Sequence, residues 1–135
     1  TVDEILEEFY EDSLRALRES IDREGIFRTE SVDMTAFFRV LCELANRDMP
    51  LFRRLARGGG YTYYMERVRT LLRDGIENFY RAQGVHSEPE LRLLGEFYAA
   101  AIMRVYLIWL KGEADMDEAR LAELMGKAAG GAASL

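Results

Sequence analysis

The chain is poor in the residues that carry most metal and nucleophile chemistry. Its 135 residues include one cysteine, one histidine and two prolines. A single cysteine excludes an internal disulfide, and the apolar neighbours of Cys42 favour a buried structural thiol over a nucleophile. A single histidine, His86, excludes the paired histidines of zinc motifs, and Glu-x-x-His and Gly-x-Ser-x-Gly do not occur. We therefore expect no enzyme active site, no metal site and no cofactor.

Positive charge and long apolar runs are also scarce. The chain has 18 Lys and Arg against 24 Asp and Glu, a net charge of −6, which is the wrong sign for neutralising nucleic-acid phosphates. The most apolar stretch, residues 97–110, contains Arg104 and is shorter than the roughly 20 apolar residues that span a bilayer. The first residues lack the basic start and apolar run of a signal peptide. These absences predict a cytoplasmic protein that does not bind a membrane.

Strand patterns are nearly absent, whereas apolar residues recur with helical spacing along the chain. The spacing predicts helices over residues 2–24, 33–45, 49–57, 61–82 and 88–111, and a last one from 115 or 117 to 128. Gly25, Gly84 and Gly112 stand where three of these helices would end. Ser87 and Glu90 fit a capping box at the start of the fifth. We expect an all-α, antiparallel bundle of about five to six helices in one domain, residues 1–128, with a flexible tail, residues 129–135.

The fifth helix is the most informative segment, because Arg104 is the one residue between 97 and 110 that is not apolar. A helix that is apolar on nearly all sides must be covered on nearly all sides. We expect a second subunit to cover what the domain itself leaves open, so that the last two long helices of each copy form a four-helix dimer interface. The alternative is a helix that is simply central in a monomer. The candidate interface residues are Ala100, Met103, Leu107, Leu110, Leu121, Leu124 and Met125.

Aromatic and methionine side chains are plentiful, and they line ligand cavities in helical domains as well as ordinary cores. The candidate pocket residues are Phe38, Tyr64, Val68, Tyr98 and Arg104. A buried arginine needs a partner or a route to water. Arg104 therefore either holds an anionic or polar ligand or forms a structural ion pair, within the subunit or across the dimer.

A family resemblance rests on the order of motifs in the last third of the chain. Phe97-Tyr98-Ala99-Ala100-Ala101 leads to Trp109, then to Lys111-Gly112-Glu113, an acidic start at residues 115–118 and a short final helix ending in Leu124-Met125. This order resembles the C-terminal regulatory domain of TetR-family transcriptional repressors, and residues 34–55 fit it too. Three residues depart from the family pattern: Arg104 replaces a small residue, and Leu107 and Ile108 replace polar ones.

The resemblance implies a function that the composition does not. Residues 1–6 look like the linker that follows a DNA-binding helix-turn-helix in that family, so this domain would be missing from the chain. The chain would then be a homodimer that senses an unknown small-molecule effector and reaches DNA only through the missing domain. A helical protein–protein adaptor without a small ligand is the alternative, and it predicts a solid core and a large apolar outer groove. A small enzyme that uses carboxylates and Arg104 would need inward-pointing acids, and most acids here fall on polar faces.

Overall fold

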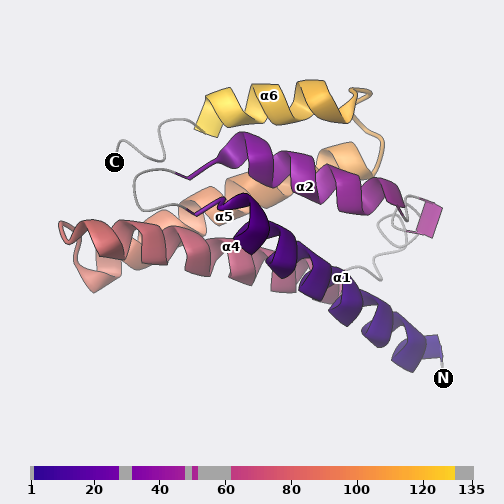
Figure 1. Ribbon diagram of the computed structural model, residues 1–135, viewed down its shortest axis with the longest axis horizontal. Helices are drawn as coiled ribbons and strands as arrows, with labels where there is room; N and C mark the ends of the chain where they lie inside the picture. The colour runs from indigo at the N-terminus through magenta and orange to yellow at the C-terminus, as the bar shows by residue number, and fades with distance from the viewer. Residues whose placement is uncertain (1, 28–31, 48–49, 52–61, 130–135) are drawn as a thin grey trace.

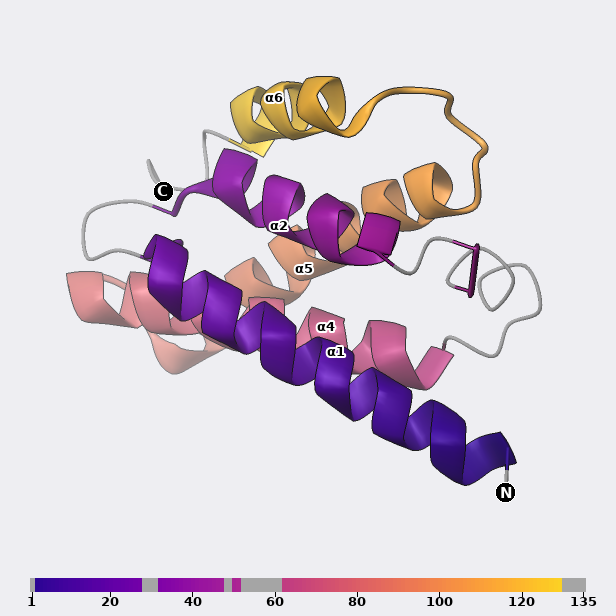
Figure 2. The same cartoon turned by 45° about the vertical axis from the view of Figure 1, so that its right-hand side comes forward.

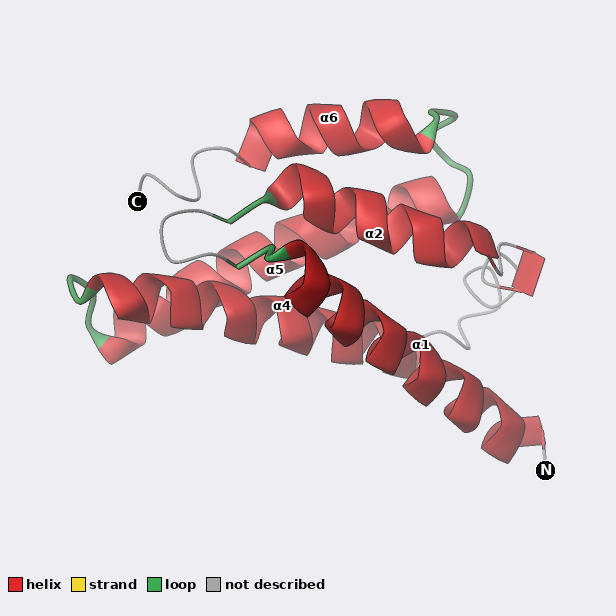
Figure 3. Cartoon of the chain, viewed as in Figure 1, coloured by secondary structure: helices red, strands yellow, loops and turns green. Residues whose placement is uncertain are grey.

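The computed structural model describes residues 2–27, 32–47, 50–51 and 62–129, and this part of the chain is helical with no strand (Figure 1, Figure 3). Its named helices are α1 (Val2–Glu24), α2 (Met34–Arg47), α4 (Thr62–Gln83), α5 (Glu88–Leu110) and α6 (Glu118–Ala128). The predicted all-α fold is confirmed, with bounds that differ from the expected ones by a few residues at most. Of the expected helix over 49–57, Pro50 and Leu51 are described and both are helical. The described residues do not include the rest of this expected helix. They also do not include the glycines at 58–60 or the tail from residue 130.

Local signals in the sequence fix where these helices begin and end. The capping box at the start of α5 is present: Ser87 Oγ accepts a hydrogen bond from the Glu90 amide (3.4 Å), and the Ser87 amide donates to Glu90 Oε1 (2.7 Å). That second bond lowers the pKa of the Glu90 carboxyl, so it stays ionised at neutral pH. Asp117 caps α6 by accepting from the Arg120 amide at 2.8 Å. Gly112 ends α5 at φ 77°, in the left-handed region that favours glycine.

The helices pack as two antiparallel pairs with α1 crossing both (Figure 1, Figure 2). One pair is the α4–α5 hairpin, closed at its turn by an ion pair between Arg81 and Glu88 (3.0 Å). The other pair is α2 and α6, since α6 runs back along α2. The Asn46 side chain bonds to Glu118 at one end of this pair, and Gly126 lies over Thr35 at the other.

The pairing of α6 with α2 corrects the expectation that α5 and α6 lie together at a dimer surface. The apolar side of α6, with Leu121 and Ala122, is buried within the same chain. The helix that is covered on nearly all sides is α2, which buries Met34, Ala36, Phe37, Phe38, Val40, Leu41, Cys42 and Ala45. Burial of eight of its 14 residues requires neighbours on more than one side. The centre of the fold is therefore α2, whereas one side of α5 is not covered by the described residues.

Tyrosines fill much of the core below α2. Tyr64, Tyr80 and Tyr106 are fully buried. The Tyr10 and Tyr64 rings stack at 5.3 Å between centroids, which joins α1 to α4. Burial raises the pKa of Tyr106 well above its ordinary value, and the neighbouring Tyr64 and Cys42 raise it further. Residues from α2, α4 and α5 thus meet in one apolar cluster.

Candidate interaction surface on helix α5

Helix α5 has two apolar sides, and the fold covers one of them. Its buried residues are Leu91, Gly95, Ala99, Ile102, Met103, Tyr106, Trp109 and Leu110. Yet 39% of its most apolar 18-residue window is buried. By length and composition α5 could cross a membrane, but one such helix is weak evidence for a span, because core helices of soluble proteins have the same features. The remaining apolar residues of α5 are half-buried or exposed.

We call the exposed side of α5 the outer face and define it as Glu90, Leu93, Leu94, Phe97, Ala100, Ala101 and Arg104. Leu93 is 71% exposed and Phe97 68%, and Leu94 is half-buried. An open hollow of about 740 Å³ lies along this face, lined by His86, Glu90, Leu93, Leu94, Glu96, Phe97 and Ala100. Single exposed apolar residues are ordinary, whereas a contiguous apolar patch with a polar rim marks an interaction site.

Opposite charges stand at the two ends of the outer face. Glu90 lies in the first turn of α5, and Arg104 lies 14 residues later, about 21 Å along the axis at 1.5 Å per residue. Arg104 is exposed, and the described residues form no ion pair with it. The expectation of a buried Arg104 is therefore wrong, because the turn of the helix places this residue on the side away from Ile102, Met103 and Tyr106.

The predicted interface residues divide between the surface and the core. Ala100 is exposed and Leu124 is 40% exposed, while Leu107 and Met125 are half-buried. Met103, Leu110 and Leu121 are buried in this chain, so their assignment to a dimer surface is wrong in this arrangement. The reason is that Met103 and Leu110 lie on the covered side of α5, and Leu121 faces α2. Leu93 and Phe97 were not among the predicted interface residues. Their spacing to Ala100 and Arg104, in steps of three or four, was the available signal.

The predicted pocket residues also separate. Phe38, Tyr64 and Val68 are buried in the same core cluster, with exposed fractions of 0 to 1%. Burial raises the pKa of the Tyr64 phenol above its ordinary value. Tyr98 is half-buried and Arg104 exposed, and none of the five lines either hollow described for this chain. The structure thus buries three of the five in the same core cluster.

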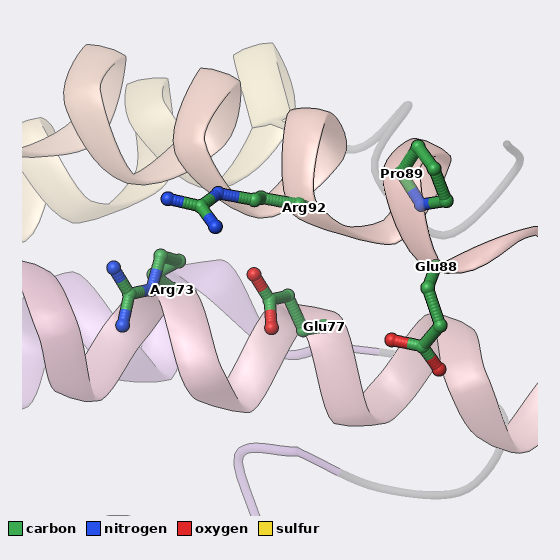
Figure 4. Close-up of a pocket in the computed structure, with 5 residues that line it drawn as sticks. All are labelled: Arg73, Glu77, Glu88, Pro89 and Arg92. Atoms are coloured by element: carbon green, nitrogen blue, oxygen red, sulfur yellow. The ribbon is translucent and has the colours of Figure 1, made fainter.

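The second hollow, of about 560 Å³, lies between α4 and the first turns of α5 (Figure 4). It is lined by Arg73, Glu77, Glu88, Pro89 and Arg92. Arg73 pairs with Glu96 at 3.1 Å, and Glu88 pairs with Arg81. The described residues form no cluster of metal-ligating side chains here or elsewhere. Partly exposed ion pairs of this kind contribute little stability. The charges of Arg73 and Glu88 are each already paired with an opposite charge of the same chain.

Two buried polar atoms near the α4–α5 turn, Tyr80 Oη and His86 Nε2, have no hydrogen-bond partner among the residues that the structure describes. Their rings meet edge to face at 5.5 Å. Burial and the nearby Tyr98 raise the pKa of Tyr80 to about 12, so its hydroxyl keeps its proton. Such unpaired groups cost stability, because they lose water and gain no partner.

Comparisons of this chain with protein-family models, with curated proteins and with solved structures find no match. Any functional assignment must therefore rest on the residues of the chain itself, and we base it on the outer face of α5, where Leu93 and Phe97 are exposed next to each other.

Proposed function

We propose that this chain is the dimerising, effector-sensing domain of a TetR-like transcriptional repressor that works in the cytoplasm. The outer face of α5 carries the proposal, because it is an apolar surface that the described residues of its own chain leave uncovered. Burying Leu93 and Phe97 from two subunits would gain on the order of 5 kcal/mol before the cost of association. In this proposal DNA is contacted by a helix-turn-helix segment outside the sequence.

The sensing part of the proposal concerns the contact between α1 and α4. Here Tyr10 stacks on Tyr64, and Glu11 accepts hydrogen bonds from Tyr63 (3.1 Å) and Arg67 (3.0 Å). An effector that enters the aromatic core beside Tyr64 would bind better when α1 is displaced, and would shift the population toward that arrangement. The support is the resemblance together with the aromatic lining of this contact.

Light scattering on the chain tests the dimer directly. We expect twice the subunit mass of 15.5 kDa at micromolar concentration. Phe97→Glu should lower the mass to that of one subunit, because it places charge in the apolar face. Ile5→Glu is the matched control, since Ile5 is equally exposed (67%) but lies on α1. Circular dichroism should show that both variants keep their helices.

A helical protein–protein adaptor is the second candidate, and a specific observation favours it. Phe38, Tyr64 and Val68 are buried and line neither of the two described hollows, and the apolar hollow lies outside the core, along α5. A chain that stays monomeric at micromolar concentration would make the adaptor the better explanation, because the outer face would then bind a protein other than a second copy of this chain.

A further inference from the structure

We infer that α5 pairs with α5 of a second copy in an antiparallel arrangement, with Phe97 on the two-fold axis. This inference rests on the proposed dimer, and it adds which residues meet across the contact. Phe97 lies midway between the two charged ends of the outer face, Glu90 and Arg104. In an isologous contact every residue pair occurs twice. An antiparallel pair of identical helices is therefore favourable when the residues before the two-fold axis complement those after it.

Side-chain size supports the antiparallel register. The half of the outer face before Phe97 carries the bulky Leu93 and Leu94, and the half after it carries the small Ala100 and Ala101. With Phe97 on the axis, Leu93 faces Ala101 of the second copy and Leu94 faces Ala100. Large against small lets two helices interdigitate without voids or overlap. A parallel pair would instead oppose leucine to leucine and leave gaps at the alanines.

Charge supports the same register. The antiparallel pair places Glu90 of each copy opposite Arg104 of the other, giving two ion pairs at the rims of the apolar face. Arg104 has no ion-pair partner among the described residues of its own chain. A parallel pair would bring the two Arg104 side chains together, and like charges in contact disfavour association. The register that matches size thus also matches charge.

The same charges argue against a bilayer as the occupant. Helices that lie on membranes carry Lys and Arg along the border of their apolar face. Here Glu90 and Glu96 border the hollow, and the chain has a net charge of −6. Glu96 is held by Arg69 (2.7 Å) and Arg73 (3.1 Å), so those two cations are already engaged.

Disulfide cross-linking tests the register. Leu93→Cys and Ala101→Cys proteins, each made separately and then mixed under mild oxidation, should form a covalent dimer. Either variant alone should not, because its two copies would lie about 12 Å apart along the helix axis, beyond the reach of a disulfide. Cys42 does not interfere, because it is buried and its pKa is raised to about 12.

Charge exchange supplies an independent readout. Arg104→Glu should weaken the dimer about tenfold or more, and Arg104→Gln less than that. Adding Glu90→Lys to Arg104→Glu restores opposite charges but also removes the bond from the Ser87 amide to Glu90, so it should recover part of the lost affinity and not all of it. A dimer that forms but cross-links Leu93→Cys to itself would overturn the register and leave the proposed dimer intact. A monomeric chain, including one that floats with neutral phosphatidylcholine vesicles, would overturn both.

Discussion

Gly126 should be the residue that permits α6 to lie against α2. A Cβ built at this position would stand 1.7 Å from Thr35 Oγ1, 2.8 Å from Thr35 Cβ and 3.1 Å from Thr35 Cα. Rotation of the threonine side chain can remove the first clash. It cannot remove the other two, because those atoms are fixed to the α2 backbone. Gly126→Ala must therefore push the end of α6 away from α2.

Two opposing terms set the size of the effect. Overpacking typically costs about 1–3 kcal/mol. Alanine in place of a helical glycine returns up to about 1 kcal/mol of helix propensity, and less in the last turn of a helix. We expect a net loss of about 1 kcal/mol in the free energy of unfolding, which is roughly 3–5 °C in Tm for a chain of this size.

Urea and thermal unfolding followed by circular dichroism, at one fixed protein concentration, would measure this loss. Thr35→Ala removes the hydroxyl and should recover part of it in the double variant. Gly84→Ala is the matched control: its φ of 73° makes alanine costly, but no atom lies within 4 Å of the added Cβ, so Thr35→Ala should give it no relief. A Gly126→Ala protein as stable as the parent would refute the close approach of the two helices.

Three further substitutions or conditions have expected outcomes. Tyr80→Phe should raise the free energy of unfolding by up to about 1 kcal/mol in urea titrations, because it removes a buried hydroxyl that lies near Tyr98 but makes no hydrogen bond to the described residues. Glu96→Gln should cost less than about 1 kcal/mol at about pH 7, since the carboxylate is 38% exposed. The hydrogen bond from Arg73 lowers the Glu96 pKa below its ordinary 4.5. The stabilisation is therefore fully present above pH 4.5 and is lost as the pH falls through the lowered pKa, so the difference in Tm between the two proteins should shrink as the solution is acidified. Thiol reagents should modify Cys42 at the rate of local or global unfolding, because burial raises its pKa to about 12.

Much of the fold could be predicted from the sequence because the helix ends carry local signals. The capping box at Ser87 and the left-handed glycines at 25, 84 and 112 depend on a few neighbouring residues. The period of apolar residues within each helix is also local. These signals place α1, α2, α4, α5 and α6 within a few residues of their observed bounds.

The arrangement of the helices could not be predicted in the same way. The apolar residues of α5 predict burial but not which side is buried, because both sides carry large apolar residues, such as Phe97 on one and Tyr106 on the other. The choice depends on α4, which lies against the side of Gly95, where a Cβ would stand 3.2 Å from the Arg73 carbonyl oxygen. Arg104 falls on the opposite side as a result. The place of α6 depends likewise on Gly126 and Thr35, which are 91 positions apart in the sequence.

The two parts of the proposed function meet in α4, which lies between α1 and α5. Arg67 of α4 pairs with Glu11 of α1, and Arg69 and Arg73 pair with Glu96 of α5. These ion pairs are partly exposed, so each contributes little interaction energy. A displacement of α1 is therefore coupled only weakly to α5 through any one of them. Val68 of α4 is fully buried, and close-packed side chains of this kind resist displacement more strongly than partly exposed ion pairs. An effector that displaces α1 would therefore act on the outer face of α5 through the packed side of α4, and truncation of Val68 should uncouple the two sites more than loss of any one ion pair.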